Sequence, residues 1–95
     1  MPVGIIMDFQ GATLEQYDQV LEKMGLATGG PVPPEGLFHW VTKTDGGIRV
    51  TDVWHSREAF DRFAEEHIGP ITQEVGFPGP PTMTYFDVHS YLIAG

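Results

Sequence analysis

Two short stretches of the chain hold a histidine and an aspartate at positions from which they could act together. His39 lies in the run LFHWVTK and Asp52 in the run IRVTDVW, with TDGG between the runs. If these runs form a hairpin that pairs Lys43 with Ile48, His39 lies opposite Asp52. A carboxylate beside an imidazole fixes its tautomer, which is the arrangement of an oriented general base. The alternative is a polar pair across two strands, in which each side chain satisfies the hydrogen bonding of the other under a subunit interface and neither takes part in a reaction.

A second histidine could do similar chemistry near the end of the chain. In the run TMTYFDVHSYLI, Thr82 to Ile93, side chains alternate between two faces of a predicted strand. One face holds five residues: Met83, Tyr85, Asp87, His89 and Tyr91. His89 could remove a proton or bind a ligand oxygen or haem iron, and either tyrosine could hydrogen bond to a developing oxyanion. The alternative for His89 is a buried histidine bonded to a neighbour.

These residues need a scaffold, and the chain predicts six elements in the order β-α-β-β-α-β. Runs rich in β-branched and aromatic residues predict strands at residues 3–9, 37–43, 48–54 and 82–93. The TDGG turn joins the second strand to the third, because Asp-Gly favours positive φ. This order predicts a ferredoxin-like α+β fold, an antiparallel four-stranded sheet with both helices on one face. The length of 95 residues suits one domain, residues 1–95.

Each predicted helix has a recognisable start. Thr13 forms a capping box with Gln16, three residues later, and Gly25 is placed to end the first helix. Ser56 caps the second helix. The pair Gly69-Pro70 should interrupt that helix, because proline lacks an amide proton and its ring clashes with the preceding turn. Between the first helix and the second strand lies a loop rich in glycine and proline, which could be a flap over a cavity or a passive linker.

Because both helices are expected on one face of the sheet, the other face would be bare. Alternation predicts that one set of residues of the last strand packs under the helices: Thr84, Phe86, Val88 and Leu92. The opposite set, with Trp54 from the hairpin, would form an amphipathic bare face. The other hairpin face, with Phe38 and Trp40, could face the helices, although the reverse remains open. Two copies packed sheet to sheet would cover the bare face and leave a central space for a small aromatic molecule.

Composition narrows the class of partner. The formal charge is −8, from 13 acidic and 5 basic side chains, which argues against binding to nucleic acid or to an anionic membrane surface. The chain has no cysteine, so thiolate chemistry and cysteine metal sites are excluded. No two histidines have the spacing of a local zinc motif. We see no signal peptide and no membrane span, and we expect a cytoplasmic protein.

The segment DVWHSREAFDRF, with the element order and the length, resembles the antibiotic-biosynthesis-monooxygenase-like (ABM-like) domains of the dimeric α+β barrel superfamily. In that group a strand ending in acidic-x-Trp enters a helix through Ser-x-Glu-Ala. The matching residues are Asp52, Trp54, Ser56, Glu58 and Ala59. The resemblance implies a homodimer and a cavity in which Trp54 stacks on the ligand. It also implies a cofactor-independent monooxygenase or an isomerase acting on an aromatic or polyketide-like substrate.

The same superfamily includes haem-degrading and haem-binding members. Haem-degrading members carry an iron-ligating histidine ten residues after the strand tryptophan. The same count from Trp54 reaches Ala64, and His67 lies one helical turn further along. Haem binding would then use His89 or His67.

Three hypotheses therefore stay open. The first is an enzyme without cofactor, with His39 or His89 as its base and Asp52 orienting His39. The second is a non-catalytic protein that binds a metabolite or haem in the same cavity. The third is a structural protein whose bare face is used up by dimer contacts.

Overall fold

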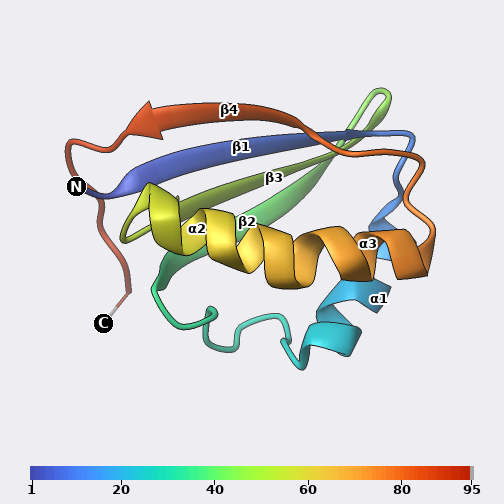
Figure 1. The fold of residues 1–95 in the computed structure, drawn as a ribbon, viewed down its shortest axis with the longest axis horizontal. Helices are drawn as coiled ribbons and strands as arrows, with labels where there is room; N and C mark the ends of the chain where they lie inside the picture. The colour runs from blue at the N-terminus through green and yellow to red at the C-terminus, as the bar shows by residue number, and fades with distance from the viewer. Residues whose placement is uncertain (95) are drawn as a thin grey trace.

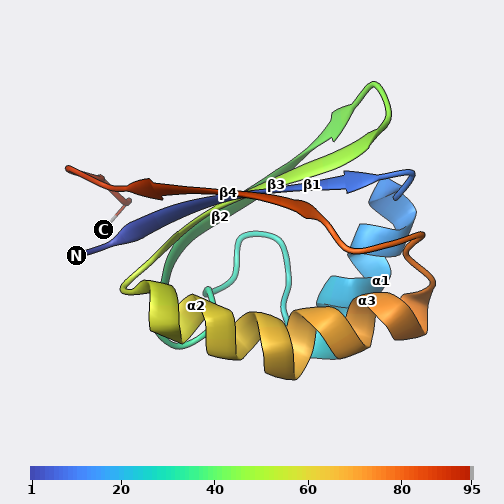
Figure 2. The ribbon, with the colours of Figure 1, turned by 45° about the horizontal axis from the view of Figure 1, so that its top comes forward.

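A computed structural model describes residues 1–94, which form one sheet with helices along one of its faces (Figures 1 and 2). The strands pair antiparallel in the order β2-β3-β1-β4. This arrangement confirms the predicted ferredoxin-like order. The elements along the chain are β1 (Val3–Gln10), α1 (Leu14–Met24), β2 (Gly36–Thr44), β3 (Gly47–Trp54), α2 (Arg57–Phe63), the π-helix η1 (Ala64–Ile68), α3 (Gly69–Val75) and β4 (Thr82–Asp87).

The hydrophobic core lies between the sheet and the helices, and the central strand β1 supplies much of it. Alternate residues of β1 are buried, with the side chain of Ile5 wholly enclosed. β3 adds its own alternate residues, because paired residues of neighbouring strands share a face of the sheet. Phe60 of α2 is also fully buried and packs edge-on against Trp54 and Tyr85. The core therefore joins α2 to two strands, β3 and β4, through one phenylalanine.

Both predicted helix starts are confirmed. The Thr13 hydroxyl accepts from the Gln16 amide, and the Gln16 side chain accepts from the Thr13 amide, which completes the capping box. Gly25 ends α1 in the left-handed region, with φ of 74°. The Ser56 hydroxyl accepts from the Ala59 amide at 3.1 Å and caps α2.

The predicted interruption at Gly69-Pro70 is wrong. The chain runs from α2 through η1 into α3 as one continuous rod (Figure 1), with Pro70 in the first turn of α3. The reason is the π-turn, in which the Gly69 amide donates to the Ala64 carbonyl five residues back. The wider turn shifts the pattern of backbone hydrogen bonds just before Pro70. In an unbroken α-helix the residue at this position would have to donate an amide proton, which proline lacks.

The predicted faces of the last strand are reversed in the structure. Met83 pairs with Met7 and Tyr85 pairs with Ile5, so both share the buried side of the sheet. Phe86 instead lies on the opposite face, with 52% of its surface exposed. Both faces of this strand are amphipathic, so alternation separated the two sets but could not say which one meets the helices.

The last strand is also shorter than predicted. β4 ends at Asp87 rather than at Ile93, and His89 and Tyr91 lie in an exposed tail that follows it. Alternation therefore does not extend to these two residues, and they do not share a strand face with Tyr85.

The hairpin between β2 and β3 keeps most of the predicted register. Lys43 pairs with Ile48 and His39 pairs with Asp52, as predicted. Thr44 and Gly47 are paired as well, so the loop has two residues instead of four, and neither takes a positive φ.

The far end of the hairpin departs from that register. Gly36, not Leu37, lies opposite Trp54, because an irregularity follows Gly36 in β2. Within residues 1–94, no helix is long and apolar enough to span a bilayer.

Replacing Phe60 tests the central position of this residue in the core. Phe60→Ala should lower the free energy of unfolding by about 3–5 kcal/mol, because the enclosed ring leaves a cavity between α2 and the sheet. Urea denaturation measures the loss. Leu92→Ala is the control, since that side chain is 95% exposed and should change stability by less than about 0.5 kcal/mol. Equal effects of the two substitutions would contradict this packing.

Candidate functional site

A cavity of about 370 Å³ lies between the sheet and the helices of a single chain. We call it the helix-side cavity. Its walls come from β1, β2 and β3, from α1, from the loop at residues 26–33, and from the helices after β3. The walls are mostly apolar, and the polar side chains among them include Tyr17, His39, Asp52 and Thr72. The loop that could be a flap or a linker therefore forms part of a wall.

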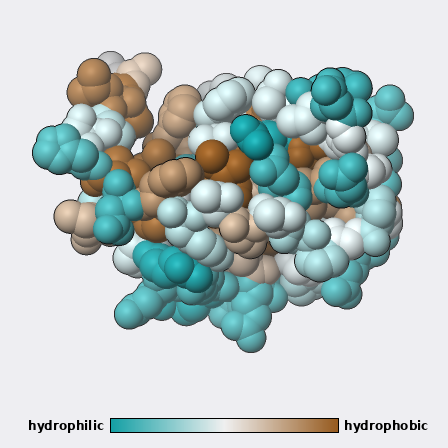
Figure 3. Space-filling model, turned by 90° about the horizontal axis from the view of Figure 1, so that it is seen from above, coloured by the Kyte–Doolittle hydropathy of each residue, from teal (hydrophilic) through white to brown (hydrophobic). Residues whose placement is uncertain are grey.

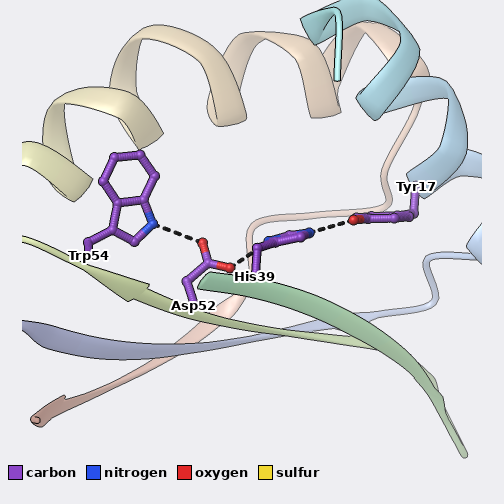
Figure 4. A network of polar contacts seen from close by, with 4 residues as sticks. All are labelled: Tyr17, His39, Asp52 and Trp54. Atoms are coloured by element: carbon purple, nitrogen blue, oxygen red, sulfur yellow. Dashed lines mark hydrogen bonds and ion pairs between the residues drawn. The ribbon is translucent and has the colours of Figure 1, made fainter. Parts of the chain in front are cut away.

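A chain of hydrogen bonds runs along one side of the helix-side cavity, and Figure 4 shows its four residues in a row. Asp52 stands near the middle, and its side chain is almost wholly buried. One carboxylate oxygen lies 2.6 Å from Nδ1 of His39, and the other accepts from the indole nitrogen of Trp54 at 3.1 Å. Both carboxylate oxygens are thus held by ring N–H groups, and the predicted pairing of His39 with Asp52 is confirmed.

Tyr17 of α1 extends the chain of hydrogen bonds to the other side of the imidazole. Its hydroxyl lies 2.5 Å from Nε2 of His39, and the two rings are within 11° of parallel. A carboxylate can only accept, so Nδ1 of His39 carries the proton that Asp52 accepts. In the neutral imidazole Nε2 is then an acceptor, and the Tyr17 hydroxyl donates to it. The Asp52 carboxylate therefore fixes the direction of both hydrogen bonds of His39, which donates through Nδ1 and accepts through Nε2.

The surroundings hold the Tyr17 hydroxyl in its protonated form. Burial is the largest cause and raises the pKa of Tyr17 to about 12, with the negative charges of Asp52 and Asp18 adding to the effect. At neutral pH the phenol is therefore a hydrogen-bond donor and not a phenolate.

The predicted site residues divide into two groups. His39, Asp52 and Trp54 meet at the helix-side cavity. Trp54 has only 3% of its surface exposed and packs on Phe63, so it forms wall and core rather than a free stacking surface. The structure does not bring the five residues predicted from the last strand into the cavity wall: Met83, Tyr85, Asp87, His89 and Tyr91.

The structure corrects the prediction of which residues lie on the bare face of the sheet. The predicted bare face included Trp54, Met83 and Tyr85, but all three lie on the side that the helices cover. Met83 and Tyr85 pack against the hydrophobic core there, and of the three only Trp54 lines the helix-side cavity. The hairpin faces are likewise settled, because Phe38 and Trp40 point away from the helices and are about half exposed.

Tyr17 is the site residue that the sequence did not single out. It belongs to the apolar stripe of α1 with Val20, Leu21 and Met24, and in sequence it reads as a core residue. The available signal was its hydroxyl, because a polar group on the buried stripe of a helix needs a partner on the sheet beneath it.

The two histidines proposed for haem do not reach the helix-side cavity. His67 is exposed and packs on the ring of Phe63, and His89 lies in the exposed tail. His39 does line the cavity, but its two ring nitrogens already bond to Asp52 and Tyr17. Among residues 1–94, no cluster of three or more potential metal-binding side chains occurs. None of the three histidines, His39, His67 and His89, therefore offers a free ring nitrogen to a haem in this cavity.

The raised pKa of Tyr17 predicts a loss of stability at high pH. The folded-state pKa of about 12 lies above the ordinary value of 10.0, so the stabilisation is complete below pH 10 and disappears as pH rises through 12. Chemical denaturation at several pH values should show this decline in the wild type. In Tyr17→Phe the decline should be smaller, whereas Tyr91→Phe, in the exposed tail, should behave like the wild type. Identical pH profiles for all three proteins would contradict the burial of the phenol.

Comparison with known proteins identifies the fold. No family model matches the sequence, and no characterised protein matches it at a significant level. Solved structures match over nearly the whole chain, among them the following two. The structure of Rv0793 from Mycobacterium tuberculosis is 19% identical, with a TM-score of 0.65, and the match covers 96% of this chain and 98% of that one.

The second match is the monooxygenase from the gene ActVA-Orf6 of Streptomyces coelicolor in complex with the ligand nanaomycin D. It is 18% identical, with a TM-score of 0.57, and the match covers 99% of this chain and 92% of that one. At this level of identity the likeness concerns the fold. The chain therefore shares its ferredoxin-like fold with these two structures, which is the fold that the element order and the resemblance to the ABM-like domains predicted.

Proposed function

We propose that this protein is a cofactor-independent monooxygenase whose substrate is a small aromatic molecule with a phenolic hydroxyl. The observation that carries the proposal is a buried carboxylate that orients an imidazole beside an apolar cavity. That combination serves a reaction that begins with removal of a proton from a largely apolar molecule. The ActVA-Orf6 monooxygenase, which shares the fold, is the comparison that supports this chemistry.

His39 is the base of the proposed reaction and Asp52 is its positioning residue. Transfer of the phenolic proton to Nε2 leaves an imidazolium beside the Asp52 carboxylate, which stabilises the new charge. The phenolate that remains has an electron-rich ring that can reduce dioxygen. One oxygen atom then enters the ring and the other leaves as water, so that a phenol and dioxygen give a quinone and water. Atoms and electrons balance without a further oxidant.

The dimensions and the walls of the helix-side cavity suit such a substrate. Its volume of about 370 Å³ lies within the range of roughly 300–1,000 Å³ that is common for small-molecule sites. Val41, Val50, Phe63 and Ile68 are among the apolar side chains that line it. A flat ring system would gain from burial against these walls. The nanaomycin D bound to the ActVA-Orf6 monooxygenase supports a ligand of the same general kind here.

We also propose that two copies of the chain associate through the sheet face that the helices leave open. Phe38, Trp40 and Phe86 lie on that face and are 49%, 48% and 52% exposed. Figure 3 looks onto this face, and apolar residues gather toward the end that carries the termini. An apolar patch of this kind favours an interface. The dimer would then be formed by residues other than those predicted, and two of them, Phe38 and Trp40, also border the helix-side cavity.

Substitution of the two candidate bases tests the proposed reaction. His39→Ala should lower turnover of a phenolic substrate at least about a hundredfold, because general-base catalysis contributes roughly 10²–10⁴-fold. His89→Ala is the matched control and should retain wild-type turnover, since His89 is exposed and outside the cavity wall. Product analysis with isotopically labelled dioxygen should show one labelled oxygen atom in the product. Loss of activity in His89→Ala alone would overturn the assignment of the base.

The same assay separates the proposal from its alternatives. Product formed equally well without dioxygen would identify an isomerase instead. Binding of phenols without turnover of any, over a panel of one-ring to three-ring compounds, would identify a binding protein.

A charge placed on the open sheet face tests the dimer. Trp40→Glu should convert the protein from dimer to monomer in light scattering coupled to size exclusion, because a carboxylate in an apolar interface has no partner. Leu14→Glu is the control, since it adds the same charge at an exposed apolar residue of α1, away from that face. A wild-type protein that is monomeric at micromolar concentration would refute the proposal.

A further inference from the structure

We infer that Tyr17 is the catalytic residue that meets the substrate, and that it selects a ligand able to donate a hydrogen bond. This inference rests on the proposed function and deepens it: the phenolic hydroxyl passes its proton to His39 through Tyr17. A neutral phenol should therefore bind well, whereas its methyl ether and a carboxylate of the same ring system should bind poorly.

The first step is the fixed direction of the hydrogen-bond chain. The Trp54 N–H donates to one oxygen of Asp52, and Nδ1–H of His39 donates to the other. Nε2 of the neutral imidazole then accepts from the Tyr17 hydroxyl, which uses its single proton. The Tyr17 oxygen keeps acceptor capacity. The end of the chain that lies at the cavity is therefore an acceptor, and its natural partner is an O–H group.

The second step is access to the base. Nδ1 of His39 faces Asp52 and Nε2 faces Tyr17, so both ring nitrogens are occupied inside the protein. Tyr17 and His39 both line the helix-side cavity, and Tyr17 stands at the end of the row in Figure 4. A ligand hydroxyl can thus reach the base through the Tyr17 oxygen without breaking a bond of the resting chain. The raised pKa of Tyr17 fits this role, because the phenol stays protonated and keeps donating to His39.

The proton transfer balances within the chain. The substrate O–H bond breaks as its proton forms a new O–H bond at Tyr17. The former Tyr17 O–H bond breaks as its proton forms an N–H bond at Nε2 of His39. Tyr17 is neutral before and after, the substrate becomes a phenolate, and His39 becomes an imidazolium that faces Asp52. The net result is one proton moved from the substrate to His39.

The third step concerns charge. Asp52 is the only carboxylate among the described residues that line the cavity, and no lysine or arginine lines it. A carboxylate ligand would lose its hydration, meet the negative charge of Asp52 and find no cation in the walls. Its oxygens can only accept hydrogen bonds, and so can the Tyr17 oxygen that faces the ligand, so no hydrogen bond would form between them. Charge and hydrogen bonding therefore exclude the same class of ligand, and both admit a neutral phenol.

Binding of three matched probes tests the inference without any turnover. Titration calorimetry in the absence of dioxygen would compare 1-naphthol, 1-methoxynaphthalene and 1-naphthoate, which share one ring system. The wild type should bind 1-naphthol about tenfold more tightly than either of the other two, since one hydrogen bond in a buried site is at stake. In Tyr17→Phe the advantage of 1-naphthol over 1-methoxynaphthalene should disappear, while the affinity for 1-methoxynaphthalene stays within about twofold.

A second variant reverses the chain of hydrogen bonds. In Asp52→Asn the Trp54 N–H requires the amide oxygen, which leaves the amide NH₂ group facing Nδ1 of His39. Nδ1 must then accept, Nε2–H donates to Tyr17, and the Tyr17 proton becomes free for a ligand. This variant should therefore bind the acceptor 1-tetralone at least threefold more tightly than the wild type does, and should lose its preference for 1-naphthol over 1-methoxynaphthalene.

Four results would each overturn the inference. The first two concern the wild type: equal affinity for 1-naphthol and 1-methoxynaphthalene, or no binding of 1-naphthol at all. The other two are a preference for 1-naphthol that persists in folded Tyr17→Phe and an unchanged preference in Asp52→Asn. Circular dichroism and thermal melting establish that each variant is folded. Donor selectivity in binding together with no turnover of any phenol would uphold the selectivity of Tyr17 and refute the monooxygenase proposal instead, so the two can fail separately.

Discussion

The site depends on one buried carboxylate and on the two N–H groups that satisfy it. A carboxylate in an apolar interior costs several kcal/mol of lost hydration unless donors replace the water. Asp52 obtains both donors from aromatic rings, the indole of Trp54 and the imidazole of His39. Once these bonds exist, the tautomer of His39 and the donor role of Tyr17 follow. The chemistry proposed for the cavity thus follows from the two hydrogen bonds that stabilise the buried negative charge of Asp52.

The fold supplies this arrangement through strand register. Antiparallel pairing of β2 with β3 sets His39 beside Asp52, and the two-residue spacing along β3 puts Trp54 on the same face. α1 then crosses that face and brings Tyr17 within hydrogen-bond distance of His39. A slip of one residue in the pairing would turn Asp52 away from the helices. The site therefore forms only when the hairpin has this register.

The helices after β3 complete the cavity in an unexpected way. The continuous rod formed by α2, η1 and α3 keeps Phe63, Ile68 and Thr72 along one wall. A helix that stopped at Gly69-Pro70 would not extend this wall as far as Thr72. The π-turn lets the helix continue through the proline. The open face of the sheet exposes Phe38, Trp40 and Phe86, which are the residues proposed to form the dimer contact.

The sequence by itself determined the element order, the capping of both helices and the pairing of His39 with Asp52, because these depend on residues near one another in the chain or on a short hairpin. Only the tertiary structure decided which face of the sheet the helices cover, because both faces of the last strand are amphipathic and alternation is symmetric between them. Contact between Tyr17 and His39 was equally out of reach, since it depends on how α1 lies across the sheet. Local patterns fix what a segment becomes, whereas the packing of helix on sheet fixes which side chains share a cavity.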